Sequence, residues 1–173
     1  HSDEAIIAPR EAPEALPRAD AQITAEPGLV LGALGADCAP VLFADPQAGL
    51  VAAAHAGWRG AFQGILDATV ARLVEAGAAP HRLRAVVGPC ISQRAYEVGE
   101  EFLERFMDED PAYGRFFSGG PQGKPHFDLP GFCLHRLREA GIADCAWTGH
   151  CTYADETRFF SYRRATHRGE SDY

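Results

Sequence analysis

The sequence predicts a single domain of the α+β class, in which helices cover mixed β-sheets. Several short apolar runs, typical of buried strands, come before the first amphipathic helical pattern. Later strand-like runs are separated by helices, which disagrees with a regular alternation of strands and helices. The length of 173 residues suits one domain with its own core. No glycine fingerprint for phosphate follows an apolar run, which disfavours the common nucleotide-binding folds.

The first third of the chain predicts strands at 5–8, 29–34, 39–44 and 50–55. The Pro-rich remainder of 2–28 is typical of a connecting segment. A helix is expected over 60–77, because apolar residues recur there at helical spacing and Gly77 provides a left-handed stop.

The second half predicts two further helices that pack on the core. Phe102, Leu103 and Phe106 share one helical face, and Asp128 is a suitable N-cap for a helix that stops at Gly141. The expected elements are strands at 83–87, 145–148 and 158–163, helices at 98–107 and 128–140, a loop at 111–125, and a loose polar tail from 165.

Charge and composition restrict the partners of the protein. Lys and Arg number 16 against 24 Asp and Glu, and the resulting formal charge of −8 disfavours nucleic acid and acidic membranes as partners. The hydrophobic fraction of 46% is typical of a packed domain, and no apolar run approaches the ~20 residues of a membrane span. Five irregularly spaced cysteines do not make a disulfide framework, so a reducing, cytoplasmic location is expected.

A turn signal at 45–49 between two apolar runs predicts an antiparallel hairpin. A hairpin centred between Pro46 and Gln47 places Cys38 opposite His55 on one face, with Cβ atoms ~4.5–5.5 Å apart. A thiolate and an imidazole at that separation suit zinc, or copper, with one more protein ligand leaving a fourth position open. The alternative is a buried free cysteine that merely lies beside a hydrogen-bonded histidine.

The residues after His55 combine an aromatic ring with a cation. Gly57 and Gly60 flank Trp58 and Arg59 at the start of the expected helix, where free N–H groups attract an anion. Arg59 adds a bidentate donor for phosphate or carboxylate, and Trp58 can stack on a planar base. The alternative is a tight turn with Trp58 in the core and Arg59 paired with a carboxylate.

Cys90 and His126 are two further candidates. Cys90 follows an expected strand, where catalytic groups of layered folds often lie, although a buried structural thiol is the commoner arrangement. His126 either lines a pocket at the start of the helix capped by Asp128 or covers that start. A thiol nucleophile at Cys90 with His126 as its base is a minor hypothesis.

Several short groups of residues follow one another along the chain. They are Asp37-Cys38-Ala39-Pro40, Ala54-His55-Ala56-Gly57-Trp58-Arg59-Gly60, Gly88-Pro89-Cys90-Ile91 with Tyr96-Glu97-Val98-Gly99, His126-Phe127-Asp128-Leu129, and Cys151-Thr152-Tyr153 with Phe159-Phe160-Ser161-Tyr162-Arg163-Arg164. In this order they resemble motifs of the YfiH family, once described as laccase-domain or polyphenol oxidase proteins and now as purine nucleoside phosphorylases. The resemblance covers nearly the whole chain and implies a layered α/β sandwich of the YfiH type.

The resemblance also implies a metal site. Family members hold a metal with the histidine of a Gln-x-His motif, the cysteine of Asp-Cys-x-Pro and the histidine of His-Ala-Gly-Trp. These ligands correspond to His1, Cys38 and His55 here. The family's N-terminal segment and its last residues have no counterpart in this sequence, so we expect one catalytic domain over 1–173 that lacks both.

The activity implied by the resemblance is zinc-dependent phosphorolysis of adenosine, inosine, guanosine and methylthioadenosine to the free base and ribose 1-phosphate, with adenosine deamination as a second activity. Arg59 and the backbone of 57–60 would hold phosphate, and Cys90 and His126 would contact the substrate. A copper-dependent phenol oxidase is the competing hypothesis, but one cysteine and two histidines supply a single metal position, whereas dioxygen reduction calls for several coppers. A non-catalytic, metal-braced binding module is the third hypothesis.

Overall fold

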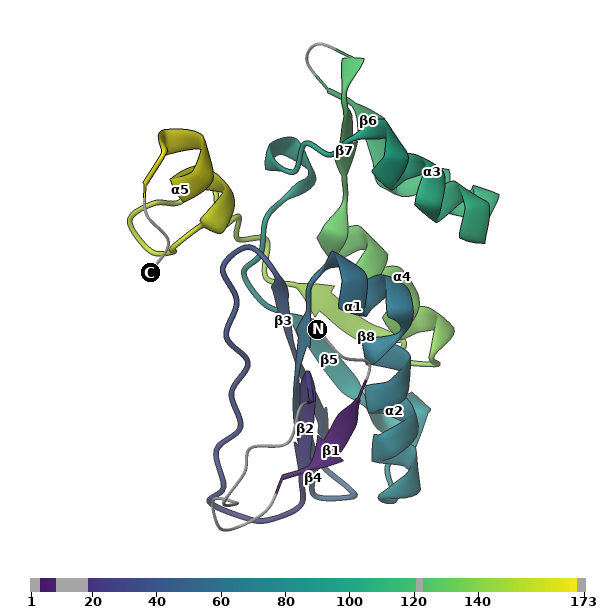
Figure 1. Ribbon diagram of the computed structural model, residues 1–173. Helices are drawn as coiled ribbons and strands as arrows, with labels where there is room; N and C mark the ends of the chain where they lie inside the picture. The colour runs from purple at the N-terminus through teal and green to yellow at the C-terminus, as the bar shows by residue number, and fades with distance from the viewer. Residues whose placement is uncertain (1–3, 9–18, 121–122, 171–173) are drawn as a thin grey trace.

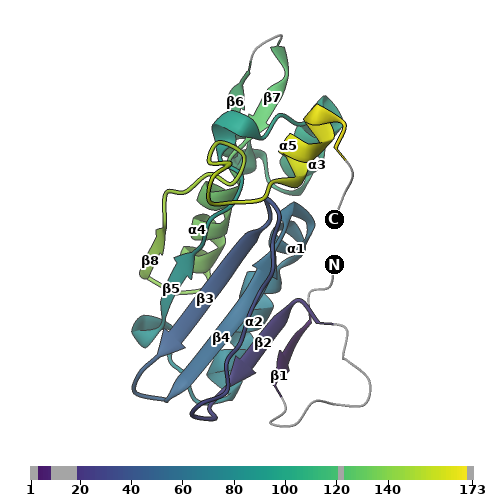
Figure 2. The same cartoon turned by 90° about the vertical axis from the view of Figure 1, so that its left-hand side faces the viewer.

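The computed structural model describes residues 4–8, 19–120 and 123–170. Its main sheet has six strands in the order β1-β2-β4-β3-β5-β8 (Figure 2). The strands are β1 (Ala5–Ile7), β2 (Ala21–Thr24), β3 (Ala39–Asp45), β4 (Leu50–Ala56), β5 (Arg84–Val87) and β8 (Asp144–Trp147). The pairs β1/β2 and β5/β8 are parallel and the pairs between them are antiparallel, so the sheet is mixed, as the sequence predicts.

Helices cover one face of this sheet (Figure 1). The covering helices are α1 (Trp58–Gln63), α2 (Ile65–Glu75) and α4 (Leu129–Glu139). Beyond one end of the sheet lie α3 (Glu100–Glu109), α5 (Tyr162–Arg168) and a two-stranded sheet of β6 (Phe117–Gly119) and β7 (Pro125–Phe127). Short 3-10 helices are formed by Pro80–Arg82, Gln93–Ala95 and Pro111–Phe116. None of the described helices is long and apolar enough to cross a membrane.

The hydrophobic core lies between the main sheet and its helices and continues to α3 and β7. Val41 and Phe43 are buried while Leu42 between them is 55% exposed, which is the alternation of a strand with one covered face. The ring of Phe106 on α3 lies 4.8 Å from that of Phe127 on β7. This aromatic contact fixes α3 against the small sheet.

The expected helix over 60–77 is in fact two helices. Gly64 between them has φ of 98°, a conformation that favours glycine, and its N–H closes α1 on the carbonyl of Gly60. The apolar periodicity runs across both helices because both cover the same sheet. The break between α1 and α2 therefore comes from the backbone conformation of Gly64 rather than from a change in the apolar periodicity.

The expected strand at 29–34 is wrong. This segment is extended but forms no ladder, and it runs along the sheet face opposite α2 (Figures 1 and 2). Val30 and Leu34 point outward with exposures of 89% and 94%. The ladder position beside β4 is taken by β2, which lies in the stretch that the sequence analysis assigned to connection.

Two expectations near the C-terminus are also wrong. The residues at 158–161 form a turn and an irregular segment rather than a strand, and Ser161 caps α5 by accepting from the N–H of Arg164. The tail from Ala165 is helical as far as Arg168, with Ala165 buried. The expected loop at 111–125 contains a 3-10 helix and β6. In contrast, α3, α4, β5 and β8 form within a few residues of the predicted bounds.

Candidate functional site

A pocket of about 280 Å³ lies where the chain enters β3. Its lining residues are Ala36, Asp37, Cys38, Trp58, Ile91, Tyr96, Leu129, Tyr162 and Arg163. They come from the start of β3, from α1, from the segment after β5, and from the starts of α4 and α5. The pocket brings together Cys38 and Trp58, two of the predicted site residues.

The buried carboxylate of Asp37 holds the pocket walls together. Its Oδ1 accepts from the hydroxyl of Thr152 at 2.6 Å, and its Oδ2 accepts from the hydroxyl of Ser161 at 2.9 Å. Oδ2 also accepts from the backbone N–H of Arg163 at 2.7 Å. Asp37 has φ of 84°, a left-handed conformation that aspartate adopts more readily than most residues. The start of β3 is thereby tied to the start of α5.

The hairpin of β3 and β4 forms with a register two residues away from the predicted one. His55 lies opposite Pro40 rather than Cys38, because β3 continues as far as Asp45, which pairs with Leu50. A shift by two residues preserves the alternation of side chains along each strand. Cys38 lies in the bend just before β3 and is not paired with His55, so the predicted opposition of these two residues is wrong.

His55 is oriented by a carboxylate. Its Nδ1 lies 3.0 Å from Oδ1 of Asp20, and the two side chains are 20% and 18% exposed. Metal-binding histidines commonly have such a partner, which sets the tautomer and makes Nε2 the ligand atom. Asp20 directly precedes β2, in the stretch assigned to connection, so only the missed strand could have revealed this contact.

Cys38 and His55 are donor types that suit a zinc or copper ion. Burial, and then the charges of Asp37 and Asp20, raises the pKa of Cys38 to about 11. A cation at the sulfur would reverse this effect, because a metal deprotonates the thiol that binds it. Two nearby carboxylates favour positive charge as well, and thiolate with imidazole is the donor pair expected for these metals.

The third predicted ligand, His1, lies outside the described residues. Among residues 4–8, 19–120 and 123–170, no group of three or more His, Cys, Asp and Glu side chains could hold a metal. Two of the three predicted ligands, Cys38 and His55, lie within the described residues, and the whole ligand set stays a prediction.

Trp58 forms an aromatic wall of the pocket. Its ring lies 4.6 Å from that of Phe102, and the guanidinium groups of Arg59 and Arg105 lie 5.1 and 5.6 Å from the same ring. Arg59 is exposed and makes no ion pair within the described part of the chain. Gly57 is the N-cap, but α1 has only six residues, so the anion attraction expected from a long helix is reduced.

Cys90 and His126 do not line this pocket. Cys90 is fully buried, and this burial raises the pKa of its thiol. Its backbone forms an isolated β-bridge with that of Cys151, and both thiols are free. His126 lies on β7, where its Nδ1 is 2.9 Å from the carbonyl oxygen of Gln93. Its buried Nε2 has no hydrogen-bond partner among the described residues. The substrate and catalytic roles of both residues stay predictions.

Comparison with known proteins places the chain in a family. The family described as "Multi-copper polyphenol oxidoreductase laccase" matches residues 1–171. The chain belongs to this family. "Purine nucleoside phosphorylase YfiH" of Escherichia coli (strain K12) is 40% identical over 153 residues, which are 88% of this chain and 61% of that protein. "Adenosine deaminase RL5" of an unknown prokaryotic organism is 39% identical over 153 residues, which are 87% and 58%.

A solved structure of a relative supports the same conclusion. Neisseria meningitidis protein NMB0706 superposes with a TM-score of 0.84 at 36% identity, over 94% of this chain and 66% of that one. The chain thus spans less than two thirds of the length of each of these three proteins. The predicted resemblance to the YfiH family and the mixed layered fold are both confirmed.

Three pocket residues of this laccase-family chain were not singled out by sequence reasoning: Tyr96, Tyr162 and Arg163. The guanidinium of Arg163 lies 5.2 Å from the ring of Tyr96, and its Nη1 donates to the carbonyl oxygen of Glu97 at 2.7 Å. The motifs that contain these residues carried the family resemblance. The incorrect strand at 158–163 hid the position of Tyr162 and Arg163, because a strand would not lead Arg163 back to β3.

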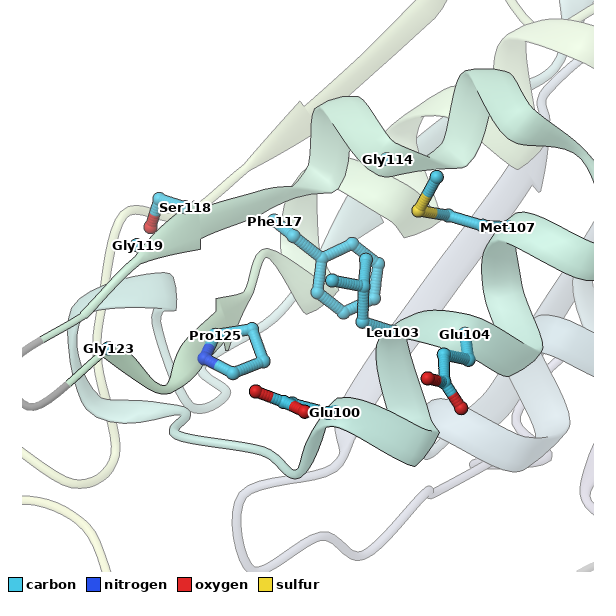
Figure 3. A pocket seen from close by; sticks show the side chains of 10 residues that line it. All are labelled: Glu100, Leu103, Glu104, Met107, Gly114, Phe117, Ser118, Gly119, Gly123 and Pro125. Atoms are coloured by element: carbon cyan, nitrogen blue, oxygen red, sulfur yellow. The ribbon is translucent and has the colours of Figure 1, made fainter.

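A larger cavity of this laccase-family chain lies elsewhere. It measures about 570 Å³ and lies between α3 and the hairpin of β6 and β7 (Figure 3). Leu103, Met107 and Phe117 give it an apolar floor, and the carboxylates of Glu100 and Glu104 stand along one wall. None of the predicted site residues lines it, so we place the candidate site at the smaller pocket.

Proposed function

We propose that the pocket beside Cys38 binds a purine nucleoside and phosphate, and that the chain carries a zinc-dependent purine nucleoside phosphorylase activity. One observation carries the proposal: a predicted metal ligand, two kinds of aromatic ring and a guanidinium share one pocket. The names of two relatives support the same substrate class. The substrates proposed are adenosine, inosine, guanosine and methylthioadenosine, and the products are the free base and ribose 1-phosphate.

Phosphorolysis sets three requirements for such a pocket. A phosphate oxygen must attack C1′ of the ribose while the bond from C1′ to the base nitrogen breaks. Positive charge develops on the sugar, and the departing base takes up negative charge. The pocket must therefore hold an anion on one side of the ribose and a planar base on the other, with water kept out.

The aromatic residues are suited to the base. Trp58 and Tyr162 offer ring faces on which a purine can stack. Burial raises the pKa of Tyr96, so its phenol stays protonated and can donate a hydrogen bond to the base. A neutral donor at this place would stabilise the negative charge of the departing purine.

Cys38 and His55, together with His1, would hold zinc at the pocket. The ion would supply a Lewis acid at the edge of the substrate. Asp20 keeps His55 in the orientation that this binding needs. Arg59 with the backbone of 57–60 would attract phosphate to the pocket, because its guanidinium is exposed and without an ion pair in the described chain.

Adenosine deamination is a second candidate activity, favoured by the name of one relative. It requires water instead of phosphate at the same pocket, so the two activities would compete for the nucleoside. A copper-dependent phenol oxidase is disfavoured, because one cysteine and two histidines supply a single metal position, whereas dioxygen reduction calls for several coppers.

The test is incubation of the zinc-loaded protein with adenosine or inosine, with and without phosphate. Chromatography then measures free base, ribose 1-phosphate and inosine. We expect base release that depends on phosphate and is lost in Cys38→Ala but kept in Cys145→Ala, a control at a partly exposed cysteine on β8. No turnover under any of these conditions would leave the metal-braced binding module as the better hypothesis.

A further inference from the structure

One side chain supplies all the positive charge that lines the pocket. Among the lining residues, Arg163 is the only lysine or arginine. The carboxylate of Asp37 lines the same pocket, but its oxygens accept from two hydroxyl groups and a backbone N–H rather than from the guanidinium. Arg59, by comparison, lies beside Trp58 but is not a lining residue.

Arg163 is held in place before any ligand binds. Its Nη1 donates to the carbonyl oxygen of Glu97 at 2.7 Å, and its guanidinium lies 5.2 Å from the ring of Tyr96. Its backbone N–H is bonded to the carboxylate of Asp37. A guanidinium held by two contacts, on a backbone held by a third, loses little further entropy when it binds an anion.

The charge of Arg163 adds to the effect of Lys124 in lowering the pKa of Glu97, but no ion pair within the described residues neutralises it. No carboxylate of the described residues forms an ion pair with it, since the Asp37 contact is to the backbone N–H. Nε and Nη2 make no hydrogen bond with any described residue. These two nitrogens are the pair that can bind two oxygens of one phosphate.

We infer that Arg163 holds the phosphate of the reaction and that Asp37 is the residue that positions it. The inference rests on the proposed function and names the anion subsite within it. Asp37 fixes the start of α5 through Ser161 and Arg163, so the guanidinium is set by the same carboxylate that closes the pocket wall. Arg59, outside the lining, would then attract phosphate without holding it during the reaction.

The first experiment measures binding of inorganic phosphate alone to the zinc-loaded protein by titration calorimetry. We expect Arg163→Gln to weaken binding by roughly tenfold to a hundredfold, and Arg163→Lys, which keeps the charge but loses the fork of donors, to weaken it less. Arg84→Gln is the matched control, since Arg84 is 70% exposed and its strand pairs it with Ala44, away from the entry of β3. Equal loss in Arg84→Gln, or unchanged binding in both Arg163 variants, would overturn the inference.

The second experiment separates the subsite from the activity. In phosphorolysis assays, Arg163→Lys and Asp37→Asn should raise the KM for phosphate and leave the KM for nucleoside nearly unchanged, with zinc content equal to wild type. Phosphate binding that depends on Arg163 without base release would support the subsite and refute the phosphorylase. Base release with an unchanged phosphate KM in Arg163→Lys would refute the subsite and support the phosphorylase.

Discussion

The hydroxyl of Thr152 donates to the carboxylate of Asp37 at 2.6 Å, although 115 positions separate them in the sequence. Both side chains are buried, so neither water nor another group can easily replace the bond. We expect Thr152→Val to lower the free energy of unfolding by about 1–3 kcal/mol, because it leaves the charged acceptor short of a donor. Urea denaturation measures the change, and Thr148→Val at an exposed position should leave the midpoint nearly unchanged. Equal midpoints for the two variants would contradict this role of Asp37.

Asp20 and His55 allow a test of the metal site. Asp20→Asn keeps an acceptor oxygen for Nδ1 but removes the carboxylate, so His55 becomes a less basic ligand. We expect zinc affinity to fall by about 10–100-fold. Competition with a coloured chelator measures it, and Asp144→Asn, at an exposed carboxylate paired with Arg84, is the control. A zinc affinity equal to wild type would mean that Asp20 does not support a ligand.

Asp45 makes the stability depend on pH. Hydrogen bonds from Arg82, foremost, and from backbone N–H groups lower the pKa of its carboxyl from 3.8 to about 2. A carboxyl with a lowered pKa in the folded state stabilises above its unfolded pKa, and this contribution disappears as pH falls from 4 towards 2. We expect the melting temperature of Asp45→Asn to fall less steeply over this window than that of wild type. Parallel slopes in thermal melts would contradict the assignment.

Phe106 tests the aromatic contact between α3 and the small sheet. It is fully buried against Phe127 and Phe132, so Phe106→Ala removes packing on several sides. We expect a loss of about 3–5 kcal/mol in the free energy of unfolding. Phe160→Ala, at a ring 43% exposed, should change it by less than about 0.5 kcal/mol. Similar losses in both variants, measured by urea denaturation, would refute this account of the core.

Local sequence signals correctly predicted the elements that are stabilised by contacts between residues close in the sequence. Asp128 caps α4 through the N–H of Gly131 at 3.0 Å, as a residue of its type before a helical pattern should. The strand expected at 29–34 failed for a different reason. An apolar, extended segment becomes a strand only if a neighbouring edge is free, and β2 had taken the place beside β4.

The sequence by itself determined that the runs on either side of 45–49 pair as an antiparallel hairpin. The alternation of a strand has period two, so even a register wrong by two residues keeps the same strand residues on the same face. Only the tertiary structure decided that Arg163 reaches the same pocket and that Asp20 supports His55. Those contacts join segments far apart in the chain, and their geometry depends on how the whole core packs, which no local pattern encodes.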